Sequence, residues 1–172
     1  MAPEEIDAAF ARFVVSLLTG DFGPPADDEW AAELVAAHIV LNNDLISEVA
    51  EDVAIGRRPA YDNARAVDEK VLSAFADGVG GLAGLARELD RSAARLAAAM
   101  ASLDAGRAAQ EIDVRVHDSG RLVREGPVAI GKFIEGNATF HLDLHHDQLR
   151  ALVRPPGEAP LDAVLPPWRD QD

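Results

Sequence analysis

The chain has no cysteine and few aromatic or basic residues. Without a cysteine among its 172 residues, it has no disulfide framework, no cysteine nucleophile and no thiolate metal site. Aromatic residues make up only 5%, and 16 lysines and arginines stand against 30 aspartates and glutamates. The formal charge of −14 repels phosphate backbones and anionic lipid. We therefore expect neither nucleic acid nor a membrane surface as a partner.

Long apolar runs are missing too. No stretch approaches the roughly 20 apolar residues that a membrane-spanning helix needs. The N-terminal sequence MAPEEIDAAF is acidic, whereas a secretory signal begins with a basic segment followed by an apolar one. We expect a soluble, cytoplasmic protein. With 48% hydrophobic and 27% charged residues, the composition is that of a globular chain, and its length suits a single domain over residues 1–172.

The apolar residues recur mostly at helical spacing. This periodicity predicts four helical segments, which cover residues 4–18, about 28–55, from after the turn at 61–63 to about 103, and 127–152. Glycines between positions 78 and 84 predict a kink or a break into two helices within the third segment. Residue Trp168, in the proline-rich tail that follows, is expected to pack on the surface.

A different pattern covers residues 112–125. There apolar and polar residues alternate on both sides of an Asp-Ser-Gly turn at 118–120, which predicts a short β-hairpin. Together with the four helical segments, this gives an expected all-α fold: a four-helix bundle with a small β-hairpin inserted before the last helix.

Histidines are the best potential metal ligands in a chain without cysteine. His141 and His145 are four residues apart, so they lie about one turn apart on one face of the last helix. His38 lies in the apolar stripe of the second helix, between Leu34 and Leu41. Three imidazoles with an open fourth position are a common arrangement for catalytic zinc. The alternative is that these are core histidines, hydrogen-bonded to one another or to nearby amide side chains, Asn42 and Gln148.

The predicted inward stripe of the last helix is apolar at both ends and polar in the middle. It consists of Ile130, Ile134, Asn137, His141, Leu144 or His145, Gln148 and Leu152. Asn137 and Gln148, one turn on either side of the histidine pair, are candidates for orienting substrate or supporting the ligands. His146 lies about 140° around the helix from His141, so we expect it on the solvated face. His117 is expected at the hairpin turn without a functional role.

The segments ELVAAHIVLNNDLI and HLDLHHDQLRAL resemble the DinB-like superfamily. This group includes the N-terminal domain of mycothiol-dependent maleylpyruvate isomerase and the bacillithiol-transferase relatives. The similarity in element order and length spans nearly the whole chain, including VHDSGRLVREGPVAI before the last helix. The resemblance implies a four-helix bundle that holds a divalent metal through His38, His141 and His145. Relatives often show His-x-x-His-His with the second of the paired histidines as ligand, so His146 in place of His145 stays open.

The resemblance also implies a function. We expect a metal-dependent enzyme that transfers or isomerises a small-molecule substrate with the help of a low-molecular-weight thiol such as mycothiol. Zinc and nickel are the expected metals, and iron is the alternative. Two other functions remain open: a metal-dependent hydrolase, and a non-enzymatic helical module that binds a partner. A homodimer is compatible with each of them.

Overall fold

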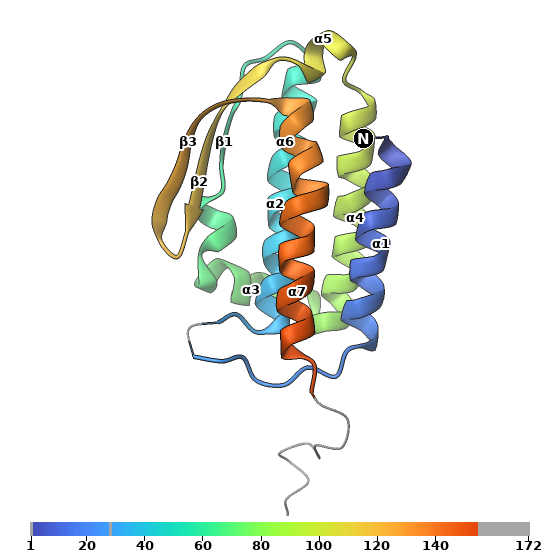
Figure 1. Cartoon of the computed structure of the whole chain (residues 1–172), viewed down its shortest axis with the longest axis vertical. Coiled ribbons are helices and arrows are strands. Elements are labelled where there is room, and N and C mark those ends of the chain that lie inside the picture. The colour runs from blue at the N-terminus through green and yellow to red at the C-terminus, as the bar shows by residue number, and fades with distance from the viewer. Residues whose placement is uncertain (1, 28, 155–172) are drawn as a thin grey trace, which may run out of the picture.

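The computed structural model describes residues 2–27 and 29–154, and within them the chain is mostly helical with a small sheet. Four long helical segments run side by side along the long axis (Figure 1). They are α1 (Pro3–Thr19), α2 (Ala32–Ala54), α4 (Gly81–Ala101) and a last helix composed of α6 (Ile130–Gly136), the π-helical turn η2 (Asn137–His141) and α7 (Leu142–Leu152). The shorter elements are β1 (Ala60–Asp62), the 3-10 helix η1 (Ala64–Val67), α3 (Glu69–Val79), α5 (Ala105–Ala108), β2 (Glu111–Asp118) and β3 (Arg121–Ala129).

Helix α2 is the most buried of the long helices. It packs against α4 and the last helix and also contacts α3, η1 and β1. It buries side chains on nearly all sides, including four that are polar: His38, Asn42, Asn43 and Ser47. Helices α4 and α7 pack against it, and α1 packs in turn against α4 and α7 with mainly aliphatic and phenylalanine side chains. Among the described helices, none has both the length and the apolar character that a transmembrane segment requires.

The expected break in the third helical segment is confirmed. Helix α3 ends and α4 begins at Gly80 and Gly81, which have φ angles of 89° and 70°. This left-handed backbone conformation favours glycine, because glycine has no Cβ atom to clash. Asp68 caps the start of α3 by accepting hydrogen bonds from the backbone N–H groups of Lys70 and Val71.

The predicted hairpin is present as β2 and β3, but the sheet has a third strand. Strand β1 pairs in parallel with β2, aligning Tyr61 with Val114, and lies in the segment predicted as a turn. A strand of three residues is too short to show alternation in the sequence. Strand β3 also continues through Pro127 to Ala129, so the last helix begins at Ile130 and not at residue 127. Proline is tolerated there because β3 has only β2 as a neighbour among the described residues.

The predicted inward stripe of the last helix is confirmed at Ile130, Ile134, Asn137, His145 and Leu152 but not at Gln148. From η2 onward the buried residues are Asn137, Ala138, Leu142, His145, Leu149 and Leu152. Of the two alternatives at one position, His145 is buried and Leu144 is 52% exposed, and Gln148, also predicted in the stripe, is exposed. A π-turn contains one residue more than an α-turn, so everything after it is rotated by about 100° relative to an unbroken α-helix. The tail with Trp168 lies outside the described residues.

Candidate metal centre

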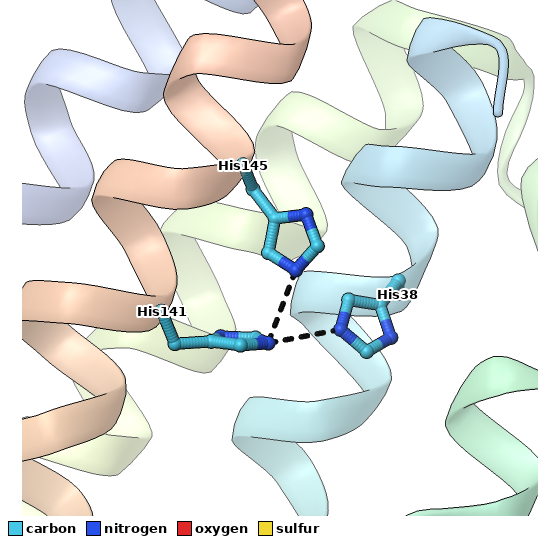
Figure 2. Close-up of side chains that lie close together, drawn as sticks. All are labelled: His38, His141 and His145. Carbon is cyan, nitrogen blue, oxygen red and sulfur yellow. Dashed lines mark hydrogen bonds between the residues drawn. The ribbon is translucent and has the colours of Figure 1, made fainter. Parts of the chain in front are cut away.

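Three histidines from two helices converge between α2 and the last helix. His38 projects from α2, His141 ends the π-turn and His145 follows one turn later in α7 (Figure 2). The Nε2 atom of His141 lies 3.1 Å from Nε2 of His38 and 3.0 Å from Nε2 of His145. One ring nitrogen of each residue lies within 4.8 Å of the other two. The cluster predicted from the sequence therefore exists as a group of neighbouring side chains.

The protonation of two of these rings follows from their outer contacts. His38 Nδ1 lies 2.6 Å from the backbone oxygen of Ala66, and His145 Nδ1 lies 2.6 Å from Oε1 of Gln148. Both oxygens can only accept, so each Nδ1 carries the proton and donates it. The Nε2 atoms of the two neutral rings are then bare, and their lone pairs face His141. His141 Nε2 carries at most one proton, so it can donate a full hydrogen bond to only one of them.

The spacing of the nitrogens fits a small transition-metal ion. Around a tetrahedral zinc ion with Zn–N bonds of about 2.0–2.1 Å, neighbouring ligand nitrogens lie about 3.3 Å apart. The two Nε2–Nε2 distances of 3.1 and 3.0 Å are only slightly shorter. A small outward movement of the rings thus makes room for an ion. Three ligands would leave one tetrahedral position for water or a substrate.

Burial keeps the three imidazoles uncharged. Burial, together with repulsion from His145, lowers the pKa of His38 from 6.5 to about 4 and that of His141 from 6.5 to about 2. Burial also lowers the pKa of His145, while the hydrogen bond to Gln148 and the charge of Asp118 oppose this shift. All three rings are therefore neutral at pH 7, which is the form that binds metals.

The backbone oxygen that orients His38 is itself held in place by the sheet. The N–H of Ala66 donates to the backbone oxygen of Asn63 at 2.8 Å within the η1 turn. The buried side chain of Asn63 forms two hydrogen bonds with the backbone of His117. It accepts from the N–H of His117 at 2.6 Å and donates to the carbonyl oxygen of His117 at 3.1 Å. On another side, the Trp30 ring lies 5.3 Å from the His38 ring, centroid to centroid. Neither Asn63 nor Ala66 was identified from the sequence.

Two other histidine predictions need correction. His146 is not on the solvated face: it is half-buried, with Nε2 at 2.7 Å from Ser16 Oγ and its ring 5.8 Å from that of Phe13. The rotation introduced by the π-turn carries it toward α1 and away from the cluster, which contains His145 instead. His117 belongs to β2 and not to the turn, and its Nε2 is 3.2 Å from Asp62 Oδ1 without hydrogen-bond geometry.

Comparison with known proteins adds no relative. No protein-family model, curated protein or solved structure matches the chain.

Proposed function

We propose that His38, His141 and His145 hold a divalent metal ion, zinc or nickel in the first place and iron as the alternative. The observation that carries this proposal is the direction of the lone pairs. Outer hydrogen bonds to Ala66 and Gln148 place protons on Nδ1 of His38 and His145, so their Nε2 lone pairs face a third imidazole nitrogen at 3.1 and 3.0 Å. A core of structural histidines would instead supply a donor to each of these Nε2 acceptors.

We further propose that the centre serves a thiol-dependent transferase or isomerase. Three neutral ligands leave the full charge of the ion uncompensated, and such an ion lowers the pKa of a thiol or water bound at its free position. The chain has no cysteine, so the thiol must come from a cosubstrate such as mycothiol. The Trp30 ring packs beside that of His38, and His141 is the least buried of the three histidines.

The helical arrangement supports this assignment. Four long helical segments, a small sheet element before the last helix, and ligands on the second and last of the four match what the DinB-like resemblance implies. We therefore assign the chain to a DinB-like four-helix bundle as part of the proposal. A homodimer and a cytoplasmic location stay predictions from the sequence.

The test is an assay that varies metal and thiol separately. The protein is loaded with zinc or nickel and incubated with mycothiol or bacillithiol and small electrophiles, with maleylpyruvate as the isomerisation substrate. We expect turnover that needs both metal and thiol and that is lost in His141→Ala. Turnover that needs metal but no thiol would make the protein a hydrolase. If metal binds stoichiometrically and no turnover occurs with any combination, the centre is structural and the enzyme proposal is wrong.

A further inference from the structure

A second polar cluster lies directly beside the histidines. It consists of Asn42, Asn43 and Asn137, which are 4%, 0% and 6% exposed, and we refer to it as the asparagine layer. The Nδ2 of Asn42 donates to Oδ1 of Asn137 at 2.7 Å, and the Nδ2 of Asn137 donates to Oδ1 of Asn43 at 2.9 Å. Both ends of the Asn137 amide are thus bound to α2.

The asparagine layer is one helical turn away from the histidines on both helices. Asn42 follows His38 by four residues on α2, and Asn137 precedes His141 by four residues on the last helix. The pairs Asn42–Asn137 and His38–His141 therefore join the same two helices at neighbouring levels. Any shift of Asn137 relative to α2 is passed on to His141 through a single turn of helix.

That single turn is the π-turn. Its first residue is Asn137 and its last is His141. We measure directions around the helix axis from Asn137, which points inward. In an unbroken α-helix, His145 would then lie at about 80° and Leu144 at about −20°, so Leu144 would be the one that points inward. With one residue more in the turn, His145 moves to about −20° and Leu144 turns outward. The observed burial follows the second pattern, since His145 is buried and Leu144 is 52% exposed.

From these observations we propose that Asn137 is a positioning residue for the metal centre. By binding α2 through both ends of its amide, it holds the π-turn in the register in which His141 and His145 both face His38. This inference rests on the proposed metal site. The side chain of Asn137 is hydrogen-bonded to Asn42 and Asn43 and not to the three histidines, so its effect would be transmitted through the helix.

The contacts around the asparagine layer support a fixed position. Oδ1 of Asn42 accepts a hydrogen bond from the Tyr61 hydroxyl of β1, and Nδ2 of Asn43 donates to Ser92 Oγ of α4 at 3.3 Å. Tyr61 and Ser92 thus pair the side-chain atoms of Asn42 and Asn43 that Asn137 does not bind. Burying such a network is costly unless its members are paired, so a purely apolar contact would be the simpler way to pack these helices.

The test compares Asn137→Ala with Ser92→Ala as the matched control. Both variants remove a buried side chain of the same network, but Ser92 belongs to α4 and has no bond to the last helix. Cobalt(II) serves as the probe, because its visible absorption reports the number and geometry of its ligands. Each protein is titrated with cobalt, and then with zinc in competition, at a temperature where circular dichroism shows it to be folded.

We expect Asn137→Ala to bind cobalt and zinc about 10-fold or more weakly, within the range known for residues that support metal ligands, and with an altered cobalt spectrum. Ser92→Ala should keep the parent spectrum and bind within about 2-fold of the parent. If Asn137→Ala does not fold, Asn137→Ser takes its place, since its hydroxyl can keep one of the two hydrogen bonds.

The outcomes separate the two proposals. If the parent protein binds cobalt and zinc and the folded Asn137 variant matches it in affinity and spectrum, Asn137 is a packing residue and this inference is wrong. An equal loss of affinity in Ser92→Ala would also overturn it, because the effect would then come from general destabilisation. If the parent itself binds neither metal, the proposed metal site fails, and the inference fails with it.

Discussion

The asparagine layer and the histidine cluster occupy neighbouring turns of the same two helices, yet they differ in how their polar atoms are satisfied. In the asparagine layer, each amide oxygen meets a donor: Tyr61, Asn42 and Asn137 donate in turn. In the histidine cluster, three Nε2 atoms face one another and share at most one proton. One layer is complete as it stands, whereas the other has lone pairs that a cation could bind. This difference underlies our proposals that the first layer fixes the helices and that the second binds a metal.

The largest expected effect comes from pH, because the histidine cluster titrates and the asparagine layer does not. The pKa values of His38 and His141 in the folded, metal-free protein are about 4 and about 2, against 6.5 for an ordinary histidine. The unfolded chain therefore binds more protons below pH 6.5, and stability that is present above pH 6.5 is lost as the pH falls towards 4. Each such imidazole contributes about 1.4 kcal/mol per pH unit.

Urea unfolding of metal-free protein at pH 7, 6 and 5 measures this loss. His141→Leu, which removes one of the titrating rings, should show a shallower decline over the same range. An unfolding free energy that stays constant from pH 7 to pH 5 would contradict the burial of neutral histidines.

The second effect concerns metal removal. A ligand present at about 100 times its dissociation constant stabilises the folded state by about 2.7 kcal/mol, which for a chain of this size raises Tm by about 5–10 °C. We expect zinc to raise the Tm by this amount, a chelator to reverse the rise, and His141→Ala to respond to neither. Differential scanning fluorimetry measures the three states. A zinc-induced rise of the same size in His141→Ala would show that the ion binds elsewhere.

A smaller effect is expected from Gln148→Ala. The Oε1 of Gln148 accepts from His145 Nδ1 at 2.6 Å and so fixes the proton that leaves Nε2 free. Loss of this hydrogen bond should weaken zinc binding about 10-fold, which is at the low end for residues that support metal ligands. The effect stays small because Gln148 is exposed, so water can replace its oxygen. Gln110→Ala is the control, since Gln110 binds the backbone oxygen of Arg57 and makes no contact with the cluster. Equal zinc affinities of the two variants, by competition titration, would refute this role.

The smallest effect on the metal is expected from His146→Ala. His146 joins α7 to α1 through Ser16 and lies outside the cluster. We expect zinc affinity within about 2-fold of the parent, and a loss of about 1 kcal/mol in unfolding free energy from the missing hydrogen bond. Loss of zinc binding in this variant, with His145→Ala still binding, would place His146 among the ligands and contradict the register set by the π-turn.

The sequence was sufficient to predict the three converging histidines, because a spacing of four residues within one helix fixes the relative direction of His141 and His145 whatever precedes them. It was not sufficient to predict the direction of residues such as Leu144 and His146 relative to the rest of the last helix. That direction depends on the one-residue excess of the π-turn, and the residues between Asn137 and His141 carry no distinctive signal for it.

The partners of the histidines were harder still to predict. The oxygen that orients His38 belongs to the backbone of Ala66, and any residue type supplies such an oxygen. Asn63 acts through the backbone of His117, 54 positions further along the chain, and this pairing depends on the parallel strand β1 that the sequence pattern did not reveal. Gln148 was identified as a supporting residue because it lies three positions from His145 on the same helix.

The most direct test of the central claim is the metal content of untagged protein purified without chelator or metal column, before and after soaking with zinc or nickel. We predict about one equivalent in the parent and none in His141→Ala after dialysis, because the loss of one of three ligands opens the site to water. The absence of bound metal in the parent even after soaking, or a full equivalent retained by His141→Ala, would contradict the account.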